Sequence, residues 1–147
     1  MKSLVLFDSY FGNTQKIAEV IAKELGETSR AIRVSDFDKK DLENIDLLVL
    51  GSPIRGWQPS EGTNALLNSM GKDELVGVKA TTFDTRVKLF IHGDAKDKMA
   101  KILAAAGAEI ITEPMPFYVA GPQQDPHLLD GEIEKAKNWA KLIKDKI

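Results

Sequence analysis

Cysteine is absent from the 147 residues of this sequence. Its absence excludes disulfide bonds, iron–sulfur clusters, thiol catalysis and thiolate zinc sites together. The two histidines, His92 and His127, have no acidic residues at metal-ligand spacing, so we predict surface positions for both and no metal site. Any redox chemistry in this chain therefore needs an organic cofactor.

Long apolar runs and an excess of either charge are also missing. No apolar segment approaches membrane-spanning length, and the chain enters a strand after residues 1–3 without a basic leader or a cleavage site. We therefore expect a cytoplasmic protein that does not enter a membrane. The formal net charge of −2 gives no basic footprint for nucleic acid. With 43% hydrophobic residues, the chain is expected to form a single domain over residues 1–147.

The stricter nucleotide-binding signatures are missing as well. There is no G-x-G-x-x-G, and Gly51 and Gly56 have the Walker spacing but are followed by Trp57 and Gln58 instead of Lys and Ser or Thr. Dinucleotide and triphosphate sites are therefore not expected.

A short apolar run that leads through small polar residues into an amphipathic helix is the strongest positive signal. Residues 4–7 form the run, apolar residues recur at helical spacing from Ile17 to Leu25, and Gly26 lies where a C-terminal cap belongs. A strand that turns directly into a helix leaves free N–H groups at the positive helix end. The stretch predicts a phosphate site, although an ordinary strand-to-helix loop with a good N-cap looks the same.

The rest of the chain alternates between strands and helices. Further strands are expected at 31–34, 46–50, 78–83 and, interrupted by prolines, at 109–111 and 117–119; helices are expected at 65–70, from Gly93 to Gly107 and from near Asp130. The third strand should end at Gly51, and residues 84–86 should leave the fourth. Strands that are apolar throughout predict an α/β fold of three layers, with a doubly wound parallel sheet of about five strands.

The length favours strand order 2-1-3-4-5 over a fragment of a Rossmann sheet. In that order a ligand binds beyond the carboxyl ends of the strands, at the switch point between strands one and three. Three loops should converge there, formed by residues 9–14, 52–60 and 84–94.

These loops resemble those of the flavodoxin family, and the resemblance spans the whole chain. Residues 9–14 resemble the family's loop for the phosphate of FMN, and residues 51–60 are similar to the loop that borders the isoalloxazine ring. Residues 83–86, Phe-Asp-Thr-Arg, look like the third loop of one subgroup, whose C-terminal helix resembles residues 131–140. The resemblance implies a flavodoxin-like fold, FMN as cofactor, and cofactor contacts from Ser9, Tyr10, Phe11, Gly12, Asn13, Thr14, Ser52, Pro53, Ile54, Arg55, Gly56, Trp57, Phe83, Asp84, Thr85 and Arg86.

Several aromatic and charged residues have two interpretations. Phe11, where many family members have Thr or Ser, is expected to pack, as is Trp139. Trp57 lies in a loop beside the expected ring, and the sequence leaves open whether it contacts the flavin. Arg86 is either a surface arginine or a neighbour of the flavin.

Two functions remain open. The implied one is an electron carrier, expected to be a monomer, that shuttles single electrons between larger redox proteins. The alternative is a flavin-dependent reductase of the same fold acting on a quinone or another small substrate, but this chain leaves few residues for a substrate pocket. A phosphoacceptor receiver domain does not fit, because strand three ends in Gly51 and Ser52 rather than an aspartate and Asp8 has no acidic partner beside it.

Overall fold

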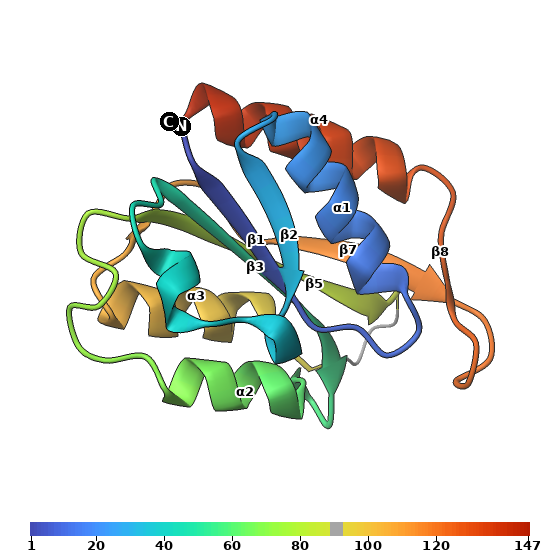
Figure 1. The fold of residues 1–147 in the computed structure, drawn as a ribbon. Coiled ribbons are helices and arrows are strands. Elements are labelled where there is room, and N and C mark those ends of the chain that lie inside the picture. The colour runs from blue at the N-terminus through green and yellow to red at the C-terminus, as the bar shows by residue number, and fades with distance from the viewer. Residues whose placement is uncertain (89–92) are drawn as a thin grey trace.

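A parallel sheet forms the middle layer of the molecule (Figure 1). The protein is described here by a computed structural model, which places residues 1–88 and 93–147. The main strands are β1 (Ser3–Phe7), β2 (Ser29–Arg33), β3 (Leu47–Arg55), β5 (Lys79–Val87) and β7 (Met115–Ala120). They lie parallel in the order β2-β1-β3-β5-β7, which confirms the predicted order.

Three two-residue strands enlarge the sheet to eight strands within the described residues. β4 (Gln58–Pro59) pairs antiparallel with β3, and β6 (Glu109–Ile110) pairs parallel with β5. β8 (His127–Leu128) runs antiparallel to β7 and extends that edge. The sheet is therefore larger than the predicted five strands, although its parallel centre is as expected.

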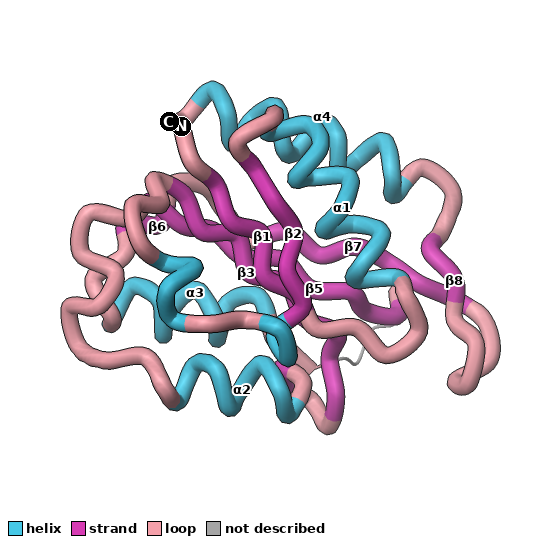
Figure 2. Tube along the Cα trace, in the orientation of Figure 1, coloured by secondary structure: helices cyan, strands magenta, loops and turns pink. Residues whose placement is uncertain are grey.

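Helices cover both faces of the sheet and complete the three predicted layers (Figure 2). α1 (Asn13–Leu25) and α4 (Glu132–Asp145) pack together on one face. α2 (Glu61–Asn68) and α3 (Lys96–Ala105) cover the other, with 3₁₀ turns η1 (Val34–Asp36) and η2 (Lys39–Leu42) after β2. No helix in residues 1–88 or 93–147 is both long and apolar enough to cross a membrane.

The central strands lack polar alternation because they are buried on both faces. All five residues of β1 are buried. Val5 and Phe7 face the core beneath α1 and α4, whereas Leu4 and Leu6 face the core beneath α2 and α3. Each such side chain contributes about 1.5–3 kcal/mol on burial.

The predicted ends of two strands were wrong. β3 continues past Gly51 to Arg55, and β5 continues through residues 84–86 to Val87. The two extensions pair with each other, with Ser52 opposite Asp84 and Pro53 opposite Thr85. Because β1 pairs with β3 only as far as Gly51, Pro53 lies beyond that ladder, where its missing N–H costs little.

Candidate functional site

A cavity of about 550 Å³ opens at the carboxyl ends of the parallel strands. It brings together most of the predicted site residues, namely Ser9, Tyr10, Phe11, Asn13, Thr14, Pro53, Ile54, Arg55, Gly56, Trp57, Thr85 and Arg86. Among the described residues, the cavity is also lined by Val87, Gly93, Val119 and the segment that contains Gly121, Pro122, Gln123 and Pro126. The predicted convergence of three loops is thus present, with a contribution from the connection between β7 and β8 that the sequence analysis missed.

Four predicted residues do not line this cavity: Gly12, Ser52, Phe83 and Asp84. Phe83 lies in the core, where its ring contacts those of Phe117 and Trp139 edge-on at centroid distances of 5.7 and 6.1 Å. A side chain at Gly51 would overlap the Phe83 ring, so the glycine makes room for it. The packing role predicted for Trp139 is confirmed by its 2% exposure.

The first loop forms a turn that ends at the start of α1. Gly12 is the N-cap residue and has φ +91°, a left-handed conformation that suits glycine. Its N–H donates to the Ser9 hydroxyl at 3.0 Å, and the Ser9 N–H donates to Asp8 Oδ1 at 2.9 Å. The first N–H groups of α1 have no acceptor within the helix and lie at its positive end. This end of the cavity is therefore suited to an anion.

Phe11 does not pack as predicted; it is 46% exposed at the rim of the cavity, as is Tyr10. The bond between Gly12 and Ser9 closes the turn, and the two half-exposed aromatic residues lie between them in the sequence. The Arg55 guanidinium lies 4.3 Å from the centre of the Tyr10 ring and so links the first loop to the second.

Buried hydroxyls and amides tie the first loop to its neighbours. Thr14 and Thr85 share a hydroxyl hydrogen bond of 2.9 Å that joins α1 to β5. Asn13 donates from Nδ2 to the Pro126 carbonyl at 2.8 Å. Both side chains are at most 5% exposed, so the start of α1 is held from two sides.

Ser52 supports the site without lining the cavity. Its hydroxyl accepts a bond of 2.9 Å from the Ser60 N–H, and the Ser60 hydroxyl donates to Asp8 Oδ2 at 2.5 Å. Asp8 in turn accepts from Ser9, so a partly buried chain of hydrogen bonds connects the second loop with the first. The sequence analysis gave Asp8 no role at the site, because its partner Ser60 is 52 residues away.

The second loop is a tight hairpin between β3 and β4. Ile54 pairs with Pro59 and Arg55 with Gln58, which leaves Gly56 and Trp57 as the two turn residues. Their φ angles of +57° and +69° are those of a type I′ turn. Trp57 lines the cavity and is 58% exposed, so its indole is available to a ligand.

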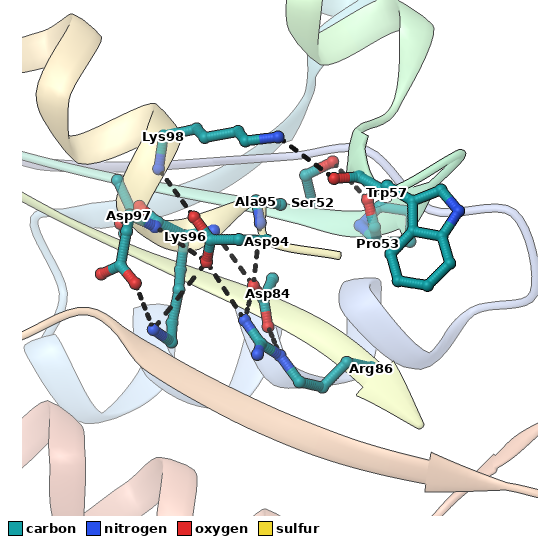
Figure 3. Close-up of polar contacts among 11 residues, drawn as sticks. Ser52, Pro53, Trp57, Asp84, Arg86, Asp94, Ala95, Lys96, Asp97 and Lys98 are labelled. Carbon is teal, nitrogen blue, oxygen red and sulfur yellow. Dashed lines mark hydrogen bonds and ion pairs between the residues drawn. The ribbon is translucent and has the colours of Figure 1, made fainter. Parts of the chain in front are cut away.

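The start of α3 holds the tip of this hairpin (Figure 3). The Trp57 carbonyl accepts from the Asp94 N–H and from Lys98 Nζ, each at 3.2 Å. A Cβ at Gly93 would overlap the Trp57 backbone, so the close approach requires glycine there. The sequence analysis placed Gly93 at the opening of a helix and in the loop of residues 84–94, without this contact with Trp57.

A buried ion pair joins Arg86, which lines the cavity, to Asp84, which does not (Figure 3). Asp84 is fully buried; its Oδ1 accepts from Arg86 Nε at 2.8 Å, and its Oδ2 accepts from the N–H groups of Ala95 and Lys96 at 3.3 and 3.0 Å. Arg86 also approaches Asp94, with Nη2 and Oδ1 3.4 Å apart. Asp84 therefore both neutralises Arg86 and caps α3.

The interpretation of Arg86 as a surface residue was wrong, because the side chain is only 7% exposed. Burial acts to lower the pKa of Arg86, but the hydrogen bonds and negative charges of Asp84 and Asp94 outweigh it and leave the pKa raised. The guanidinium stays charged at neutral pH. Of the two histidines, His127 is exposed as predicted, whereas His92 lies outside the described residues.

Comparison with known proteins gives the family. The family model of the flavodoxin domain, which describes sequences of that family, matches residues 4–109, so this chain belongs to the flavodoxin family. No curated protein gives a significant match.

Solved structures agree with this assignment at the level of the fold. Oxidised flavodoxin 1 from Bacillus cereus is 22% identical, with a TM-score of 0.83 over 100% of this chain and 99% of that one. Oxidised flavodoxin 2 from Bacillus cereus is 22% identical with a TM-score of 0.82, and each chain is covered completely. A flavodoxin from the domain Archaea is 18% identical, with a TM-score of 0.79 over 99% of this chain and 98% of that one.

Proposed function

We propose that this protein binds FMN noncovalently in the cavity at the carboxyl ends of the strands and carries single electrons between larger redox proteins. The observation that carries the proposal is the meeting, in one cavity, of an anion-suited helix end with exposed aromatic residues from separate loops.

The start of α1 suits the phosphate group of FMN. The Ser9 hydroxyl and the unpaired N–H groups of the first helical turn lie at the positive end of the helix. Residues 9–14 contain no Lys or Arg, so the phosphate charge would be met by N–H groups and hydroxyls. A hydrogen bond to a charged group contributes about 1.5–3 kcal/mol, so a few of them suffice for a selective site.

The remainder of the cavity suits a flat, largely apolar ring. Pro53, Ile54, Val87 and Val119 give it apolar walls, and Trp57 and Tyr10 lie at its rim. These residues would hold the ring and exclude water from one side of it, while bound FMN would supply the one-electron chemistry. The family's second loop borders the same ring, which supports placing it beside Gly56 and Trp57.

The test begins with the apoprotein and FMN. We expect saturable binding of one FMN per chain, with quenched flavin fluorescence and a yellow product. Lys101→Gln, on the exposed side of α3, is a matched control and should bind FMN as the unchanged protein does. Failure to bind any flavin would overturn the proposal.

A second measurement separates the carrier from the reductase. Anaerobic reduction of the FMN-loaded protein should take up two electrons at two separate midpoint potentials, and the reduced protein should pass electrons one at a time to ferricyanide. Rapid, saturable turnover of a quinone with NADH or NADPH would instead identify a reductase.

A further inference from the structure

Arg33, the last residue of β2, lies against the phosphate loop although it is distant from that loop in sequence. Arg33 pairs in register with Phe7, the residue at which β1 leads toward the loop. Its Nη1 donates to the Ser9 carbonyl at 2.9 Å, and its Nη2 donates to Gln15 Oε1 at 2.8 Å. The guanidinium carbon also lies 5.2 Å from the centre of the Phe7 ring.

These two bonds join the two ends of the loop. Ser9 begins the loop, and Gln15 lies in the first turn of α1. The planar fork of an arginine reaches both acceptors at once, whereas a lysine offers one compact ammonium group. Arg33 is half-buried and packed on Phe7, so it holds the loop from behind with a side chain of restricted motion.

The charge of Arg33 matters as well as its geometry. Residues 9–14 contain no Lys or Arg, and the Asp8 carboxylate is bonded directly to the Ser9 N–H. An unbalanced carboxylate at that place would repel a phosphate group. Arg33, bonded to the carbonyl of the same serine, supplies the opposite charge.

We propose that Arg33 is a positioning residue that makes this protein select a flavin phosphate over riboflavin. It fixes the Ser9 carbonyl and the first turn of α1, so that the loop's N–H groups and hydroxyl point into the cavity, and it offsets the charge of Asp8. This inference rests on the proposed binding of FMN, and it concerns the phosphate end of the ligand alone.

The test compares two ligands and three variants. The dissociation constants of FMN and riboflavin are measured for the unchanged protein, Arg33→Gln, Arg33→Lys and the control Arg30→Gln. Arg30 lies on the same strand, and its guanidinium bonds Asp41 at 3.1 Å, away from the loop. Arg33→Gln should weaken FMN by roughly tenfold and riboflavin by less than about twofold. Arg33→Lys should give an intermediate loss for FMN, and Arg30→Gln should leave the ratio of the two constants unchanged.

Salt dependence gives a readout that a merely structural role would not move. FMN binding to Arg33→Gln should weaken less with added salt than FMN binding to the unchanged protein, because one charge has been removed. Equal weakening of both flavins in Arg33→Gln and Arg33→Lys would overturn the inference and leave Arg33 as a residue of the fold. Only this inference fails if the unchanged protein binds FMN and the two Arg33 variants keep the same ratio of the dissociation constants of FMN and riboflavin as the unchanged protein. If it binds neither flavin, the proposed function fails too.

Discussion

Thr14 shows how a residue of the site can also support the fold. Thr14 is 2% exposed and Thr85 6% exposed, and their hydroxyls are bonded to each other. Thr14→Val should lower the free energy of unfolding of the apoprotein by about 1–3 kcal/mol, because the Thr85 hydroxyl is left buried without this partner. Denaturation in urea measures the loss.

The double variant Thr14→Val, Thr85→Val provides the control. Once either hydroxyl is gone, removal of the other should cost little, so the double variant should be less destabilised than the sum of the two single variants. Additive losses would mean that the two hydroxyls do not act as a pair.

At the scale of elements, Asp84 couples β5 to the start of α3. It is buried, pairs with Arg86 and accepts from the N–H groups of Ala95 and Lys96. Asp84→Asn should lower the free energy of unfolding by about 3–5 kcal/mol, because a guanidinium would be left in the interior without its main counter-charge. Thermal and urea unfolding of the apoprotein would measure it.

Arg86→Met in the Asp84→Asn background tests the cause of that loss. Removal of a guanidinium that has lost its main counter-charge should recover part of the stability, so the double variant should unfold at a higher urea concentration than Asp84→Asn alone. If Arg86→Met lowers the free energy of unfolding as much in the Asp84→Asn background as it does alone, charge compensation is not the reason for the loss in Asp84→Asn.

Glu74 links the segment after α2 to η2 and gives a dependence on pH. A hydrogen bond from Lys39 at 2.6 Å is the main cause, and the Gly71 N–H a further one, of a pKa for Glu74 below its ordinary value. A lowered pKa means that the stabilisation is present above the ordinary value of 4.5 and is lost as the pH falls through the folded value. Glu74→Gln should therefore cost about 0.2–1 kcal/mol at pH 7 and progressively less below pH 4.5.

Unfolding in urea at a series of pH values measures this difference. Glu113→Gln, an exposed change elsewhere, should show no comparable dependence. A cost for Glu74→Gln that stays constant down to pH 2 would show that the ionised carboxylate contributes nothing.

At the scale of the whole molecule, the order of the sheet could be predicted because its central strands carry the clearest sequence signal. Runs such as residues 4–7 are apolar on both faces, and alternation with helices implies parallel strands. The place of the cavity followed from the order, since the carboxyl ends of the strands meet at one edge.

The details that the sequence analysis missed depend on contacts that form only in the folded chain. Asp84 and Arg86 are polar, so they suggested a loop; they remain in a buried strand because they neutralise each other. Arg33 gave no signal because its acceptor Ser9 is 24 residues away. Phe83 matches a family motif, but it packs in the core against Phe117 and Trp139.

The central claim is that the cavity binds FMN with its phosphate at the start of α1, and titration calorimetry of the apoprotein with FMN and with riboflavin tests it most directly. The two ligands differ only in the phosphate group. The account predicts that FMN binds more tightly by at least about tenfold, because riboflavin lacks hydrogen bonds to a charged group worth about 1.5–3 kcal/mol each. Equal affinities for the two flavins, or no binding of FMN, would contradict it.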